Sequence, residues 1–235
     1  MAKEISLIGL IRQNITERGY DELKNASRKK KREAIYYVHK KSSPIVTHVL
    51  ELTYKPALNA YGVHVGVYNQ EAERLMISWL PELKKFLHPL VAKSFFERDA
   101  DGVPMPSGQF FEACRYLGWQ RLVIPDPDDR SGWPKKIDEL FKNLLEPIFF
   151  RVKNVEDIKS LLLRSDPTFE WFMTNAILRV SVIVALDFLC EKPEPNLRER
   201  LYAFKDEISR ALVRSEVKDY DVLFDFLFSQ GRNPQ

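Results

Sequence analysis

The chain has 235 residues, of which 45% are hydrophobic and 29% charged, and its formal net charge is +3. These values are ordinary for a soluble globular protein. With 15 Phe and 9 Tyr available for a core, the composition excludes an intrinsically disordered chain. The length allows one large domain with a substantial buried interior.

An amphipathic helix is predicted at the start of the chain, over residues 4–18. Isoleucines recur there at three- and four-residue spacing, which is the period of one helix face, at Ile5, Ile8, Ile11 and Ile15. Gly19 follows, and glycine is the residue that most often ends a helix. Residues 21–26 are expected to add one more helical turn before a basic run begins.

The same segment lacks the features of a secretory signal peptide. Its apolar run is short, is interrupted by Arg12 and has no small-residue cleavage site. The chain has two cysteines, Cys114 and Cys190, and no C-x-x-C motif. Two free thiols are ordinary in a reducing compartment, so we expect a cytoplasmic protein without disulfides.

Three consecutive β-strands are predicted between residues 33 and 69, with short breaks at 42–44 and 55–59. The third reads AYGVHVGVYN, in which large apolar residues alternate with Gly62, His64 and Gly66. This period of two gives the strand one strongly apolar face. The glycines leave room on the other face for a close neighbour, either a helix or a ligand. The short connections favour antiparallel pairing.

A helix is predicted next, from 71 to 98, with breaks near Pro81 and Pro89 because proline removes a backbone donor. Loops are expected at 99–108 and 125–134, where Asp-Gly and closely spaced prolines occur. Between these loops, the segment WQRLVI at 119–124 reads as a fourth strand.

From Lys135 onward the chain reads as helical to near its end. The segment WFMTNAILRVSVIVALDFLC is apolar around most of its circumference, which indicates a buried central helix. Arg179 and Asp187 interrupt this segment, so the apolar run between them is too short to span a membrane. Each of these charges is expected to pair with a nearby group, because an unpaired buried charge is costly.

Together these patterns predict an α+β fold. A small, mostly antiparallel sheet of three consecutive strands plus the late fourth strand is covered by an N-terminal helix and a C-terminal helical bundle. One domain is expected, with a sheet-containing part at about 1–134 and a helical part at about 135–230.

No catalytic, metal or cofactor motif is found. The chain contains no G-x-S-x-G, no P-loop and no G-x-G-x-x-G. The four histidines lack the tight local ligand sets that zinc requires, and they are interpreted as ordinary half-buried sheet residues: His39, His48, His64 and His88. We therefore predict a protein that is not an enzyme and that needs no metal or cofactor.

Basic residues are concentrated near the first predicted strand. Residues 28–41 carry seven of them and one acid, for a local charge of +6. These residues are Arg28, Lys29, Lys30, Lys31, Arg32, Lys40 and Lys41. The functional interpretation is contact with phosphates or with an acidic protein. The alternative is that these residues form a solvent-exposed segment at the start of the hairpin, where the lysines discourage edge-to-edge pairing of the first strand.

The order of motifs resembles a bacterial family of unknown function, the one numbered 4304. The resemblance rests first on Gly19-Tyr20 followed by basic residues and on the strand YGVHVGVY. It rests further on Trp119 at the start of a late strand, and on residues 147–150 with 155–158, where a helix ends near a proline and leads into a short helix. It covers about residues 5–210, and the chain departs from it at 71–108. The family implies no catalytic residues. It implies a role as an immunity or accessory protein near toxin genes.

We therefore predict a non-catalytic, cytoplasmic protein-binding module, most plausibly an immunity or accessory protein for a toxin or effector. Its candidate surface combines the seven basic residues with the loops at 99–108 and 125–134, and its expected partner is another protein with an acidic surface. Two alternatives stay open. One is nucleic-acid binding by the run 28–32. The other is a small-molecule or enzymatic site over Gly62, His64 and Gly66.

Overall fold

A computed structural model describes residues 6–22, 34–42, 45–55, 59–88, 119–125, 131–163 and 176–230. Within these ranges the predicted α+β fold is confirmed. One antiparallel sheet has the order β1 (Tyr20–Glu22), β2 (Ala34–His39), β3 (Thr47–Lys55), β4 (Ala60–Tyr68) and β5 (Trp119–Pro125). The late strand predicted at 119–124 is β5, and it pairs with β4.

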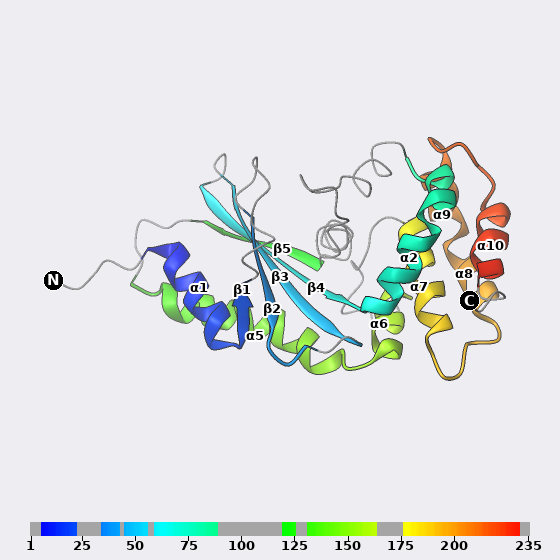
Figure 1. Cartoon of the computed structure of the whole chain (residues 1–235). Helices are drawn as coiled ribbons and strands as arrows, with labels where there is room; N and C mark the ends of the chain where they lie inside the picture. Colours follow the sequence, from blue (N-terminus) through cyan, green and yellow to red (C-terminus); the bar gives the residue numbers. More distant parts are fainter. Residues whose placement is uncertain are drawn as a thin grey trace, which may run out of the picture.

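Helices lie on one side of the sheet and at one end of it (Figure 1). The helices near the sheet are α1 (Leu7–Glu17) and α5 (Trp133–Arg151), and they contact each other. The group at the end comprises α2 (Gln70–Leu83), α6 (Val155–Leu162), α7 (Ala176–Phe188), α8 (Leu197–Leu201), α9 (Lys205–Leu212) and α10 (Tyr220–Ser229). Short 3₁₀ turns follow α2 at Lys84–Phe86 and α8 at Tyr202–Phe204.

The prediction of a helical turn at 21–26 was wrong, because β1 occupies residues 20–22. Gly19 ends α1 with a positive φ of 85°, which turns the chain so that Tyr20 lies opposite His39 of β2. Burial then alternates along the strand, with Tyr20 buried and Asp21 exposed. A three-residue strand is too short for an alternation pattern to be recognised in sequence.

The break predicted near Pro81 is present, because α2 ends at Leu83 and Leu87 is already extended. α2 includes Pro81 and extends two residues beyond it. Residues 89–98 of the predicted helix lie outside the described residues. One helix boundary differs from its prediction. The final helical region begins at Trp133 rather than at Lys135, with Pro134 in the first turn, where its missing N–H is tolerated. Pro89 lies outside the described residues.

Both faces of the central strand β3 are buried. Leu50 and Leu52 are 0% and 1% exposed on one face, and Glu51 on the other face is only 6% exposed. On β4, Gly62 and Gly66 are buried. Buried apolar side chains form one cluster that extends from α1 to α10. In the described ranges, no helix combines the length and the apolar character needed to cross a membrane.

The prediction that α7 is a buried central helix is confirmed, as is the pairing of its two charges. Arg179 is fully buried, bonds Glu207 of α9 at 2.7 Å and stacks over the ring of Phe204. Asp187 accepts a 2.7 Å hydrogen bond from Lys159 of α6. Burial opposes the charge on Lys159, but Asp187 outweighs it, so the pKa of that ammonium is raised. The two ion pairs connect α7 to α6 and α9.

Replacing the acid that faces Arg179 tests this arrangement. Glu207→Gln should lower the free energy of unfolding by about 2–3 kcal/mol, because it removes a carboxylate that pairs with a buried guanidinium. Denaturant unfolding would measure the change. Glu199→Gln, at an exposed position on α8, is the control and should change stability by less than about 0.5 kcal/mol. Equal effects of the two substitutions would contradict the assigned role.

A second test concerns His48, which connects β3 to the end of α5. Its Nε2 lies 3.1 Å from the carbonyl oxygen of Val152, and burial lowers its pKa to about 4. Between the ordinary pKa of 6.5 and that value, the unfolded chain binds a proton that the folded chain does not. Stability should therefore fall as pH drops from about 6.5 towards 4, by about 2–3 kcal/mol in total.

Unfolding curves at several pH values would measure this dependence. His48→Gln keeps a side-chain amide donor but cannot titrate, so its stability should fall less steeply over the same pH range. A wild-type and a variant curve of equal slope would show that another group causes the acid sensitivity.

Candidate functional site

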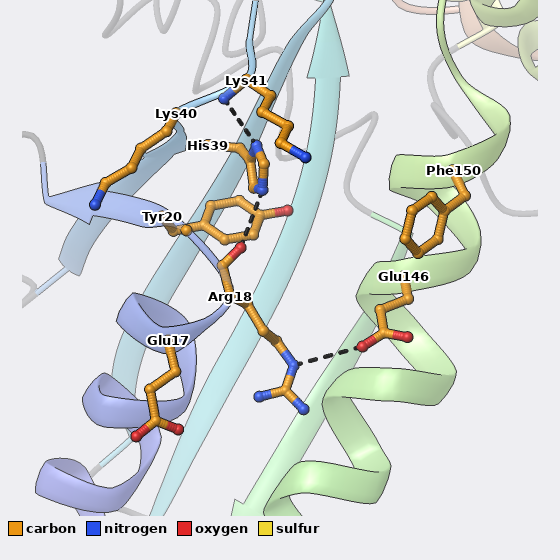
Figure 2. Close-up of a pocket in the computed structure, with 9 residues that line it drawn as sticks. Glu17, Arg18, Tyr20, His39, Lys40, Lys41, Glu146 and Phe150 are labelled. Atoms are coloured by element: carbon orange, nitrogen blue, oxygen red, sulfur yellow. Dashed lines mark hydrogen bonds and ion pairs between the residues drawn. The ribbon is translucent and has the colours of Figure 1, made fainter.

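A pocket lies where the end of α1, strand β1, the end of β2 and the second half of α5 meet (Figure 2). Its volume is about 410 Å³, within the range of small-ligand and anchor-residue sites. We call it the α1–α5 pocket, and it is lined by Glu17, Arg18, Gly19, Tyr20, His39, Lys40, Lys41, Glu146 and Phe150.

Two of the seven predicted basic residues belong to this pocket. Lys40 and Lys41 follow β2 directly, and both are exposed at the pocket rim. The remaining five, Arg28 to Arg32, lie outside the described residues, as do the loop at 99–108 and residues 126–130 of the second loop. The structure therefore supports a basic rim through Lys40 and Lys41 only.

The second predicted site is on β4 and is separate from the pocket. Gly62 and Gly66 are buried, and the side chain of His64 lies outside the described part of the structure. In the register of the sheet, His64 stands opposite Glu51. No group of three or more potential metal ligands occurs among the described residues.

The pocket is built on the turn between α1 and β1. Gly19 has a left-handed φ of 85°, and a Cβ placed on it would lie 3.3 Å from His39 Nε2. Its carbonyl accepts a 2.8 Å hydrogen bond from the backbone N–H of Lys40. A side chain at this position would be strained both by the backbone conformation and by the neighbouring ring.

His39 links the two chain segments that meet here. Its Nδ1 accepts a 3.0 Å hydrogen bond from the N–H of Lys41, so Nε2 carries the proton and donates to the carbonyl of Arg18 at 3.0 Å. Burial and the Lys41 charge lower the pKa of this imidazole, against the opposing effect of the Arg18 carbonyl. Both ring nitrogens of His39 are therefore engaged in hydrogen bonds that hold the two segments together.

Arg18 connects α1 to α5 across the floor of the pocket. It forms an ion pair with Asp138, lies 4.0 Å from Glu146 and donates to Asn14 Oδ1 at 2.9 Å. Its guanidinium also lies over the ring of Phe141, 5.5 Å from the centroid. These contacts commit the Arg18 charge to the protein itself.

The groups that remain open to solvent are of two kinds. Lys40 is 57% exposed at its side chain and makes a 3.4 Å surface ion pair with Asp21, which contributes little to stability. Phe150, on the last turn of α5, is 63% exposed. Figure 2 shows Phe150 and the side chain of Lys41 on opposite walls of the same opening. An exposed aromatic ring and ammonium groups therefore face the same opening.

Tyr20 adds a buried polar group to the pocket wall. The residue is 3% exposed, and its ring makes an edge contact with His39 at a centroid distance of 4.8 Å. Burial raises the pKa of the phenol well above its usual range, so it stays a neutral donor. No hydrogen bond joins its hydroxyl to another described residue, and the hydroxyl oxygen is not fully buried. In Figure 2 that hydroxyl is directed towards the α5 side of the pocket.

Sequence reasoning found the lysines but missed the rest of the pocket. Tyr20 and Phe150 entered the sequence analysis only through the motifs of the family resemblance. A glycine-aromatic pair directly after a helix is a usable signal for a tight turn with a buried ring. Nothing in sequence indicates that Arg18 and Glu146, which are far apart in the chain, face each other.

Comparisons of the chain with family models, with curated proteins and with solved structures find no match. The resemblance to the family numbered 4304 therefore stays a prediction, and the function is argued from the geometry of the pocket.

The turn beneath the pocket gives a direct test. Gly19→Ala should destabilise the protein by about 1–2 kcal/mol, because alanine is disfavoured at positive φ and its methyl group crowds His39. Thermal or denaturant unfolding would measure the loss. Gly132→Ala is the matched control, since a Cβ there meets nothing within 4 Å. A loss no larger than that of the control would contradict this account of the turn.

Proposed function

We propose that this chain is a non-catalytic, cytoplasmic protein-binding module that recognises an acidic protein through the α1–α5 pocket. The observation that supports the proposal most strongly is the exposed ring of Phe150 beside the exposed ammonium groups of Lys40 and Lys41, at one concave site. We further propose, from the family resemblance alone, that the partner is a toxin or effector and that the chain serves as its immunity or accessory protein.

The aromatic component suits a protein interface. Binding energy at interfaces is concentrated in a few large side chains near the centre, aromatic ones prominent among them. Phe150 projects from a long helix whose position is fixed by the Arg18 contacts with Asp138 and Glu146, so a partner would meet a ring on a rigid support. Rigid support lowers the entropy that is lost on binding.

The charge distribution suits an acidic partner. Lys40 and Lys41 stand at the rim, and the basic run 28–32 is close to them in the sequence. Excess positive charge at one site raises association rates with an acidic surface and disfavours basic partners.

Nucleic acid is a less favourable occupant of the described pocket. Glu17 and Glu146 line it, and Arg18 is held by carboxylates of α5. Two pocket acids would repel a phosphate backbone, whereas a protein surface can place individual carboxylates at the lysines and avoid them. The other alternative, a site over Gly62, His64 and Gly66, has buried glycines on β4 and gains no support from the pocket.

The double variant Lys40→Glu/Lys41→Glu tests the proposal in an affinity capture from the native lysate at moderate salt. The wild-type chain should recover a stoichiometric acidic protein, and the variant should recover at least about tenfold less, because like charges now face each other. Lys192→Glu/Lys205→Glu, at exposed positions elsewhere, is the control with the same net charge and should behave as wild type.

Two outcomes would contradict the assignment. Equal recovery by both double variants would show that the rim is a solvated surface only. Recovery of nucleic acid that added salt releases, instead of a protein, would favour the nucleic-acid alternative.

A further inference from the structure

The unused hydroxyl of Tyr20 gives the α1–α5 pocket a chemical preference. Tyr20 is 97% buried, since only 3% of its surface is exposed. Its hydroxyl, which has no hydrogen-bond partner among the described residues, belongs to the pocket lining. The oxygen atom is not fully buried although the residue is, so it opens into the pocket. A phenol donor in this position can hydrogen-bond an acceptor on an occupant.

We infer that the α1–α5 pocket is a carboxylate-binding site: Tyr20 donates its hydroxyl proton to a carboxylate oxygen, Lys41 supplies the counter-charge, and an apolar group attached to the carboxylate packs on Phe150. The inference names the chemistry that the partner presents at this pocket, and it rests on the proposed function.

The charges around the pocket favour a carboxylate over a more highly charged anion. Arg18 is engaged by Asp138 and approached by Glu146, while Glu17 accepts a hydrogen bond from Gln13 at 2.7 Å. Among the described pocket residues, the remaining positive charges are those of Lys41 and Lys40, of which Lys40 already faces Asp21. A single negative charge matches this balance, and a phosphate with two charges would meet the nearby acids.

The geometry places the three groups around one space. Figure 2 shows the Tyr20 hydroxyl and the Lys41 ammonium on the strand side, with Phe150 across from them on α5. His39 cannot compete for the ligand, because both of its nitrogens are already hydrogen-bonded to Arg18 and to Lys41. A planar carboxylate with an apolar body of one or two side chains fits a volume of about 410 Å³.

N-acetyl-L-phenylalanine provides a minimal probe, since it carries one carboxylate and one ring. Backbone amide chemical shifts of the full chain would be followed by NMR as the probe is added. The Gly19 and Lys41 amides should shift and saturate. N-acetyl-L-phenylalanine amide, which lacks the negative charge, should bind at least about tenfold more weakly.

Tyr20→Phe removes the donor and keeps the ring that packs on His39, so the fold should be retained. Its affinity for the charged probe should fall about tenfold, as expected for a lost hydrogen bond to a charged group. Lys41→Gln should lower the affinity for the charged probe and leave the affinity for the neutral amide unchanged. If the charged probe gives no saturable shift, or if Tyr20→Phe binds it as tightly as wild type does, the inference is overturned.

A second arm separates this inference from the proposed function. In one outcome, recovery of the captured protein depends on Lys40 and Lys41, while Tyr20→Phe changes neither that recovery nor the affinity for the probe. The protein-binding role then stands and the carboxylate site fails. In the other outcome, the affinity for the probe depends on Tyr20, while the Lys40→Glu/Lys41→Glu variant captures as much protein as wild type does. The carboxylate site then stands. Its natural occupant is then a free organic acid rather than a protein side chain.

Discussion

The structure around the pocket depends on one turn, in which Gly19 takes a left-handed conformation and His39 joins both sides of it. The imidazole donates to the carbonyl of Arg18 and accepts from the N–H of Lys41, while the Lys40 N–H bonds the carbonyl of Gly19. These contacts hold the end of α1 against the end of β2. They also give the backbone groups of the turn hydrogen-bond partners within the protein.

The same turn determines which groups line the pocket. It directs Arg18 towards α5, where Asp138 and Glu146 neutralise it, and it buries Tyr20 with its hydroxyl at the pocket wall. It also positions Lys40 and Lys41 at the rim, across from Phe150. His39 with both ring nitrogens hydrogen-bonded, an Arg18 that is paired with carboxylates and the buried ring of Tyr20 therefore form the inner part of the pocket. The ion pairs of Arg179 and Asp187 stabilise the C-terminal helices and take no part in the pocket.

Much of the fold was predictable from sequence, because strong periodicity marks long elements. The strands β2, β3 and β4, the late strand β5 and the buried helix α7 all have clear apolar patterns, and the paired state of Arg179 and Asp187 follows from the cost of burying charge. β1 was missed because three residues carry no period. The pocket was missed because it depends on contacts between residues more than 100 positions apart, such as Arg18 with Asp138, and on a phenol whose burial no local pattern reveals.

The central claim is that a protein partner contacts Phe150 at the α1–α5 pocket. A photo-activated cross-linking amino acid placed at position 150, followed by mass spectrometry of the cross-linked peptides, tests this contact directly. Val213, which is equally exposed at 63% on the C-terminal helices, is the reference position. Position 150 should cross-link to one protein, at a segment that contains Asp or Glu, and position 213 should give no such product. Cross-links from position 213 alone, or from neither position while the partner is bound, would contradict it.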